Sequence, residues 1–192
     1  MISVFTGPMF SGKTTMLFCS AGPDALYVTH CIDTRSATGI LCHNQSINTD
    51  VVRTKKTSDI WEIVRDKDLE KYSTIAIDEV QFFDESTNVE RAIAELRNMG
   101  KIVYVGGLDF SSNLSQFKNT RDVLKIADKS IKLQAICSVC STKNAIYTKC
   151  IVNKPASHGE IFVGGSDVYE PRCEEHFYQE RFCQEHSGVV EA

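Results

Sequence analysis

A glycine-rich stretch close to the start of the chain carries the residue types that bind phosphate groups. Residues 7–14 match the pattern G-x-x-x-x-G-K-[ST] at every fixed position. The glycines let the backbone curl so that its N–H groups point at phosphate oxygens, and a following helix adds its positive end. In this pattern Lys13 contacts the β- and γ-phosphates and the Thr14 hydroxyl binds Mg²⁺. The predicted nucleotide contacts are Gly7, Pro8, Met9, Phe10, Ser11, Gly12, Lys13 and Thr14.

Two adjacent carboxylates give a second chemical signal. Asp78 and Glu79 follow the short apolar run at residues 75–77. An acid at such a strand end commonly holds Mg²⁺ through water, which we assign to Asp78, and Glu79 is then free to accept a proton from an attacking hydroxyl or water. Each signal alone has a structural alternative, a glycine-rich turn or two solvated acids. Together they predict phosphoryl transfer or hydrolysis.

Cysteines and histidines at metal-ligand spacing occur late in the chain. Residues 137–140 form C-x-x-C, and residues 173–176 and 183–186 each form C-x-x-H. A structural zinc takes four ligands in a tetrahedron, so the sequence offers one pair too many. A strand and turn before residue 173 would return that pair to the C-x-x-C knuckle, and Cys183 with His186 remains the alternative. The predicted zinc ligands are Cys137, Cys140, Cys173 and His176.

The elements around these residues alternate between strands and helices. The apolar patterns predict strands at residues 2–5, 25–30, 73–79 and 101–109, a weaker strand at 50–54, and helices at 11–20, 58–66 and 89–99. Such alternation predicts an α/β fold with a doubly wound parallel sheet and ligands beyond the carboxyl ends of its strands. Around Ile136 the pattern changes to paired cysteines and shorter strands. We therefore expect a phosphate-loop domain at 1–135 and a small zinc-ribbon-like domain at 136–192.

Composition limits the classes of partner. The chain has 192 residues, is 42% hydrophobic, and has a formal net charge of −4. This charge argues against a broad basic face, so we expect no nucleic-acid partner. We see no signal peptide and no apolar run near the roughly 18–20 residues that cross a bilayer, so we expect no membrane contact and a cytoplasmic location. The eight cysteines then indicate metal binding or free thiols rather than disulfides.

Several motifs occur together in the order found in one known family. They are GPMFSGKTT at 7–15, DTR at 33–35, IDEVQFF at 77–83, GLD at 107–109, YTK at 147–149 and GGSDVYEPRC at 164–173. Over nearly its whole length the chain resembles the zinc-containing cellular and poxviral thymidine kinases. The resemblance implies transfer of the γ-phosphoryl group of ATP to the 5′-hydroxyl of thymidine or deoxyuridine. It also implies ATP, Mg²⁺ and a structural zinc as cofactors, and a homotetramer.

The resemblance also implies roles for single residues. Glu79 looks like the base that deprotonates the 5′-hydroxyl, and the nucleotide site gains Asp33, Arg35, Asp78 and Gln81. The residues that look like walls of the nucleoside pocket are Met9, Phe82, Leu108, Thr148 and Tyr169. The lasso loop that closes over the base corresponds to Glu160, Ile161, Phe162, Val163 and Gly164.

The chain departs from the family pattern at two places. The segment between Lys13 and Asp33 is several residues shorter than usual, which predicts a truncated first helix. Ser112 stands where the family usually has an aromatic residue, and we expect Phe110 to fill that space. Read without the resemblance, Phe82 would be a core aromatic.

Two other functions compete with the kinase. A phosphate-loop ATPase would use the same loop and would turn over ATP without a nucleoside. A zinc-ribbon module that binds nucleic acid would need Lys and Arg interleaved with aromatic residues, and the C-terminal region is not rich in them. Formation of a nucleoside monophosphate from ATP and thymidine distinguishes the three.

Overall fold

The computed structural model describes residues 1–32, 41–42, 45–46, 53–142, 144–152 and 164–178. Its centre is a six-stranded sheet in the order β5-β2-β6-β7-β1-β8, and every neighbouring pair is parallel. The strands are β1 (Ile2–Thr6), β2 (Leu26–His30), β5 (Arg53–Thr57), β6 (Thr74–Ile77), β7 (Ile102–Gly106) and β8 (Lys129–Lys132). Because β6, β7 and β1 are neighbours, their carboxyl ends meet at the same end of the sheet.

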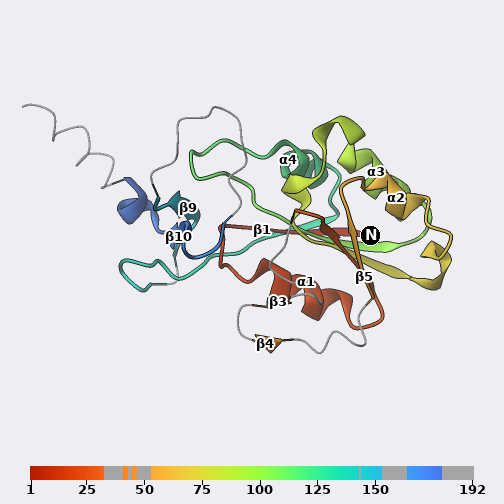
Figure 1. Ribbon diagram of the computed structural model, residues 1–192, viewed down its shortest axis with the longest axis horizontal. Coiled ribbons are helices and arrows are strands. Elements are labelled where there is room, and N and C mark those ends of the chain that lie inside the picture. The colour runs from red at the N-terminus through yellow and green to blue at the C-terminus, as the bar shows by residue number, and fades with distance from the viewer. Residues whose placement is uncertain (33–40, 43–44, 47–52, 143, 153–163, 179–192) are drawn as a thin grey trace, which may run out of the picture.

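Helices cover both faces of this sheet (Figure 1). One face carries α1 (Lys13–Ala21), and the other carries α2 (Trp61–Val64), α3 (Val89–Asn98) and α4 (Lys118–Lys125). Short 3₁₀ turns connect them, namely η2 (Leu69–Lys71), η3 (Val80–Phe82) and η4 (Glu85–Thr87). The predicted doubly wound α/β fold is confirmed. Within the described ranges, no helix combines the length and the apolar character needed to cross a bilayer.

Alternating side chains along the strands build a core on each face. The face under α2, α3 and α4 buries Ile2, Val4, Val28, Ile75, Ile77, Val103 and Val105. The face under α1 buries Phe5, Tyr27 and Ala76 against Leu17. Successive strand residues point to opposite faces, so strands covered on both sides are apolar at nearly every position. Each fully buried aliphatic side chain contributes about 1.5–3 kcal/mol.

Several element boundaries differ from the predicted ones. Helix α1 begins at Lys13 instead of residue 11, because Gly12 is in the left-handed conformation with φ 83°. Strand β6 ends at Ile77, and the acids after it leave the extended conformation, Glu79 having φ 53°. Helix α2 has only four residues and follows a turn in which Asp59 accepts from the Trp61 N–H at 2.9 Å. Strand β5 begins three residues later than predicted, and residues 50–52 lie outside the described chain.

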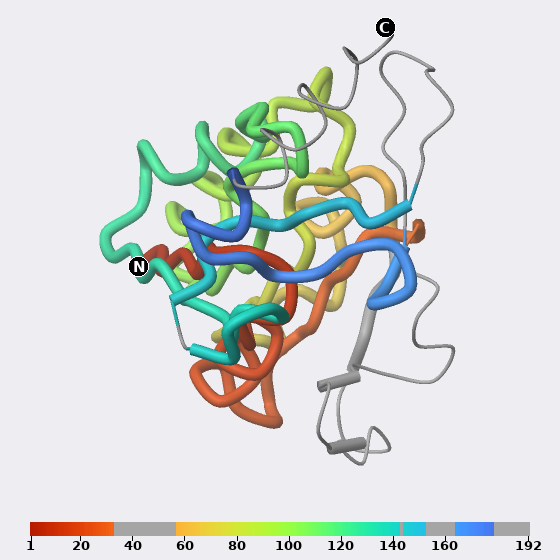
Figure 2. Tube along the Cα trace, turned by 90° about the vertical axis from the view of Figure 1, so that its left-hand side faces the viewer, coloured from red at the N-terminus to blue at the C-terminus, as the bar shows by residue number. Residues whose placement is uncertain are grey.

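A smaller module follows the sheet. Its strands β9 (Tyr147–Cys150) and β10 (Tyr169–Arg172) pair antiparallel and run side by side in Figure 2. Outside this module, a second short antiparallel pair lies near α1 and consists of β3 (Leu41–Cys42) and β4 (Gln45–Ser46). The module has a small core of its own, made of Ala135, Cys137, Ala145 and Cys173. The domain boundary between residues 135 and 136 stays a prediction. Ala135, on the N-terminal side of that boundary, packs with residues of the C-terminal module.

Candidate active site and zinc centre

The phosphate loop between β1 and α1 depends on left-handed backbone positions. Gly7 has φ 139°, Phe10 has φ 64° and Gly12 has φ 83°. A Cβ at Gly7 would collide with the carbonyl oxygen of Leu133, whereas a Cβ at Gly12 would meet nothing within 4 Å. Gly7 is therefore required by close packing, and Gly12 by its conformation.

Lys13 holds its ammonium group against this loop. Its Nζ donates to the carbonyl oxygens of Pro8 at 2.6 Å and Gly7 at 3.2 Å, and the residue is only 8% exposed. A shielded positive charge thus lies at the loop that the sequence predicts for phosphates. An open hollow of about 360 Å³ lies beside the loop, and its lining residues are Ser11, Gly12, Met16, Lys132, Leu133 and Gln134.

Asp78 and Thr14 meet at the carboxyl end of β6. The Thr14 hydroxyl donates to Asp78 Oδ2 at 2.7 Å. Burial raises the pKa of Asp78 to about 6 and the charge of Glu79 acts in the same direction, while the Thr14 hydrogen bond and the Lys13 charge oppose this rise. Above pH 6 the pair presents a carboxylate and a hydroxyl, which are oxygen ligands that suit Mg²⁺. A Cβ at Gly106 would lie 2.7 Å from Asp78 Oδ1, so the end of β7 leaves space for this carboxylate.

Glu79 stands in a strained backbone conformation next to this pair. Its φ of 53° and ψ of 44° are left-handed, which costs a non-glycine residue about 1–3 kcal/mol. Its Oε2 accepts a hydrogen bond from Gln81 Nε2 at 2.6 Å. The turn that follows is held from α4, where Asn119 Nδ2 donates to the carbonyl oxygens of Phe83 at 2.6 Å and Val80 at 3.4 Å. The surroundings therefore maintain the strained conformation.

Strand β9 brings the C-terminal module to the phosphate loop. The Met9 N–H donates to Thr148 Oγ1 at 3.0 Å, and Thr148 is buried. Leu108 and Phe82 are partly exposed on the segments that follow β7 and β6. The Phe82 ring lies 6.4 Å from the ring of His30. Three of these predicted pocket residues, Met9, Phe82 and Leu108, thus follow strands that end at the same side of the sheet, and the fourth, Thr148, contacts Met9.

Other predicted residues are placed elsewhere or fall outside the described chain. Phe110 is more than a third exposed, and its ring lies 5.5 Å from Lys132 Nζ, so its role in the pocket stays a prediction. Tyr169 is buried on β10, opposite Cys150. The predicted residues outside the described chain are Asp33, Arg35, Glu160, Ile161, Phe162, Val163, Cys183 and His186.

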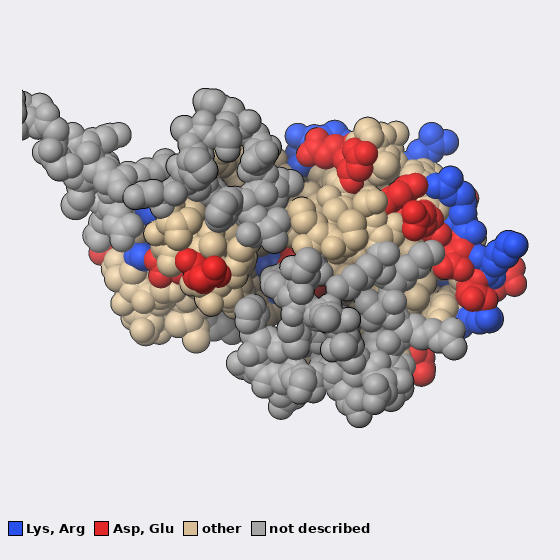
Figure 3. All heavy atoms as spheres, in the orientation of Figure 1, with Lys and Arg blue, Asp and Glu red and all other residues tan. Residues whose placement is uncertain are grey.

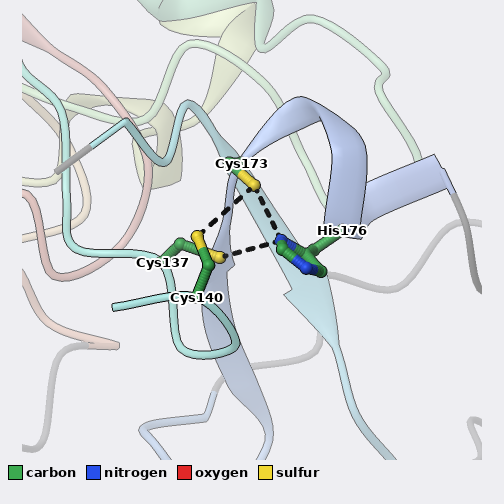
Figure 4. A group of neighbouring side chains, drawn as sticks. All are labelled: Cys137, Cys140, Cys173 and His176. Carbon is green, nitrogen blue, oxygen red and sulfur yellow. Dashed lines mark hydrogen bonds between the residues drawn. The ribbon is translucent and has the colours of Figure 1, made fainter. Parts of the chain in front are cut away.

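A cluster of three cysteines and one histidine lies between the knuckle at 137–140 and the helical turn at 174–178 (Figure 4). The ligand atoms of Cys137, Cys140, Cys173 and His176 all lie within 4.8 Å of one another. The Cys140 and Cys173 sulfurs are 4.0 Å apart. Two thiolates on a tetrahedral zinc are about 3.8 Å apart, given Zn–S bonds of about 2.3 Å. The geometry therefore fits a structural zinc with the predicted ligands.

The protonation chemistry of Cys137 also fits zinc, whereas at Cys173 the hydrogen bond from the His176 N–H is outweighed by burial and the neighbouring thiols, which raise the pKa. Burial raises the pKa of the Cys137 thiol, but backbone N–H groups donate to its sulfur and bring the pKa to about 6. A thiol with this pKa is largely a thiolate at neutral pH, which is the form that binds metal. With four protein donors, the site leaves no position for water or substrate.

Sequence reasoning missed several residues that shape the active site. Asn119 and Gly106 had no recognisable motif, and only the fold brings them to the acids after β6. His30 ends a predicted strand, and its ring lies against Phe82 and Phe83 at 6.4 and 5.3 Å. Burial lowers the pKa of His30, which favours the neutral imidazole.

The charged side chains of the described residues are mixed in sign on the face shown in Figure 3. Lys and Arg lie next to Asp and Glu mainly toward the right-hand edge of this view. Among the described residues, Asp122 pairs with Lys118, Arg121 and Lys125. This face therefore presents acids and bases together.

The doubly wound sheet, the phosphate loop and the acids after β6 define a phosphate-loop enzyme that acts on nucleotides and carries a Cys₃His cluster suited to zinc. A family model described as thymidine kinase matches residues 1–177, and the chain belongs to this family. A thymidine kinase of Pyrobaculum aerophilum is 33% identical over 187 residues, covering 92% of this chain and 98% of that protein. The chain is thus a thymidine kinase, as the sequence motifs predicted.

Proposed function

We propose that the chain transfers the γ-phosphoryl group of ATP to the 5′-hydroxyl of thymidine or deoxyuridine, with Glu79 as the general base. The observation that carries this proposal is the strained, hydrogen-bonded Glu79 directly beside the Asp78–Thr14 pair. A base next to a metal-binding pair is what a phosphoryl transfer to an alcohol needs.

The chemical step follows from this arrangement. The Glu79 carboxylate accepts the 5′-hydroxyl proton while the 5′-oxygen forms its bond to the γ-phosphorus. The bond between that phosphorus and the bridging oxygen breaks, and ADP leaves with the electron pair. Lys13 stabilises the negative charge of the β- and γ-phosphates. A positioned base typically contributes about 10²–10⁴-fold to the rate.

Two cofactors fit the remaining residues. Thr14 and Asp78 would hold Mg²⁺, which supplies neutralisation of phosphate charge when it is bound. The Cys₃His cluster would hold one structural zinc, which orders β9 and β10 and hence the pocket residues on them. We place the nucleoside part of ATP in the hollow beside the loop, with Asp33 and Arg35 as further nucleotide contacts predicted by the resemblance.

Selectivity for the base would come from main-chain groups. The lasso at 160–164 would present a fixed pattern of amides and carbonyls that suits the 4-oxo group and N3–H of thymine. Cytosine would leave buried groups unpaired, at about 1–3 kcal/mol each. Gly164 supports a tightly packed loop end, because a Cβ there would lie 2.6 Å from the Val168 side chain. From the resemblance we also propose a cytoplasmic homotetramer.

The test is a product assay with ATP and Mg²⁺ and one nucleoside at a time. Thymidine and deoxyuridine should yield their monophosphates with matching ADP, whereas deoxycytidine and deoxyguanosine should be nearly inert. Equal kcat/KM for thymidine and deoxycytidine would contradict main-chain selection of the base. ADP release that is independent of any nucleoside would contradict the transfer itself and favour an ATPase.

A further inference from the structure

The side-chain amide of Gln81 connects the proposed base to the nucleoside pocket. Its Nε2 donates to Glu79 Oε2 at 2.6 Å, and its Oε1 accepts from the Leu108 N–H at 3.0 Å. The partners fix the orientation of the amide, because a backbone N–H can only donate and a carboxylate can only accept. Gln81 is 3% exposed, so this bridge is shielded from water.

The backbone after β7 lies close to the Gln81 side chain. A Cβ at Gly107 would lie 2.9 Å from Gln81 Oε1 and 2.7 Å from Val80 Cγ1. Glycine at 107 therefore lets the segment after β7 approach the amide closely. On the other side, the left-handed Glu79 turns the chain so that residues 79 and 81 meet.

We propose that Gln81 is a positioning residue for Glu79. Its amide holds the Glu79 carboxylate in one orientation and joins it to the backbone of Leu108 in the pocket wall. The proposal rests on the proposed role of Glu79 as the base, and it replaces the prediction that Gln81 contacts the nucleotide. An error of about 1 Å in the position of a catalytic group can reduce a rate by about 10²-fold, so loss of the bridge should lower kcat.

The first test replaces the amide by a side chain of similar size, in Gln81→Met. We expect kcat to fall about 10–100-fold, while KM for ATP stays within about twofold of its original value. The matched control is Thr120→Val. Thr120 Oγ1 has no hydrogen-bond partner among the described residues and would lie 3.2 Å from a Cβ at Gly107, so it samples the same buried region. The control should keep both kcat and KM.

The second test uses a titratable replacement, Gln81→Glu. A carboxylate keeps the acceptor for Leu108 but faces Glu79 with like charge, and only its protonated form can donate as the amide does. The charge of Asp78 is coupled to Glu79 and to Lys13, and Asp109 next to Leu108 is paired with Lys132 at 2.9 Å. We expect kcat relative to the unmodified enzyme at the same pH to rise about fivefold or more from pH 8 to pH 6. The same ratio for Gln81→Met should stay flat.

The contrary results are distinct. A raised KM for ATP with kcat preserved in Gln81→Met would mean that Gln81 contacts the nucleotide, and would overturn the proposal. A flat ratio for Gln81→Glu would also overturn it, and this variant decides the matter if thermal unfolding shows that Gln81→Met has lost its fold. In the Glu79→Gln background, Gln81→Met should add less than about twofold. If the effects of the two replacements on kcat were fully additive, the positioning role of Gln81 would be refuted and the role of Glu79 as the base would stand. Normal turnover of Glu79→Gln would refute the base itself.

Discussion

The carboxyl end of the sheet and the C-terminal module keep their functional residues in place by different means. At the sheet, charged groups such as Asp78 and Glu79 are held by strands whose two faces are covered by apolar side chains. One small core cluster of the C-terminal module is Ala135, Cys137, Ala145 and Cys173, and two of these are proposed zinc ligands. A core of this size, with Phe177 buried beside it, contributes less burial than the sheet, so we expect metal coordination to supply much of the stability. We therefore expect the sheet to be preorganised without metal and the module to need zinc for its order.

Removal of the zinc should have the largest effect. We expect about one zinc per chain, and Cys140→Ser or a strong chelator should disorder β9 and β10 because structural zinc contributes about 10–16 kcal/mol to folding of small domains. Thymidine phosphorylation should be lost while ATP still binds. Metal analysis, limited proteolysis and an ATP-binding assay measure these three results. Cys19→Ser is the control, because Cys19 is exposed and belongs to no C-x-x-C or C-x-x-H motif. Active protein that contains no zinc would contradict the comparison.

Replacement of the buried carboxylate Asp78 should produce the next largest effect. Loss of zinc should destabilise the protein, whereas loss of this carboxylate should stabilise the metal-free protein. Folding raises the pKa of Asp78 from 3.8 to about 6, so the folded state binds the proton more tightly than the unfolded state. Without metal, this group therefore destabilises the protein as pH rises from about 4 to above 6, by about 3 kcal/mol at 1.36 kcal/mol per pKa unit.

Asp78→Asn should accordingly raise the Tm of the metal-free protein by several degrees at pH 8 and have no effect at pH 4. Mg²⁺ should stabilise the unmodified protein and fail to stabilise the variant, which should also lose activity. Thermal unfolding at the two pH values, with and without Mg²⁺, measures the expected changes in Tm, and a thymidine phosphorylation assay measures the loss of activity. If Asp78→Asn instead lowered the Tm at pH 8 relative to the unmodified protein, burial would not be the main influence on the pKa of Asp78.

The contact that joins the two regions should have the smallest effect. Thr148→Val keeps the side-chain shape and removes the acceptor for the Met9 N–H, at about 1–3 kcal/mol for an unpaired buried donor. Because Thr148 is itself a proposed pocket residue and contacts Met9, another one, KM for thymidine should rise about fivefold or more while KM for ATP stays unchanged. Equal changes in both constants would show that the contact supports the phosphate loop and not the pocket.

The sequence could predict the parts of the site that depend on short-range patterns. The loop at 7–14, the acids after β6 and the two zinc-ligand pairs each occupy one contiguous motif, so spacing pointed to them. For the second zinc-ligand pair, spacing also left Cys183 with His186 as an alternative. The left-handed Glu79, the space provided by Gly106 and the bonds from Asn119 depend on segments that the fold alone brings together. The amide of Gln81 shows the difference, because its motif predicted a nucleotide contact and its partners are Glu79 and Leu108.

The most direct test of the account is the turnover of Glu79→Gln. Glutamine keeps the size of the side chain and removes its basicity, so kcat for thymidine should fall at least about 10²-fold while ATP binds as before. Glu85→Gln on η4 is the matched control, because Glu85 is exposed and should leave turnover unchanged. Single-turnover measurements of thymidine monophosphate with saturating ATP separate the chemical step from binding. Near-normal turnover in Glu79→Gln would contradict the proposed base.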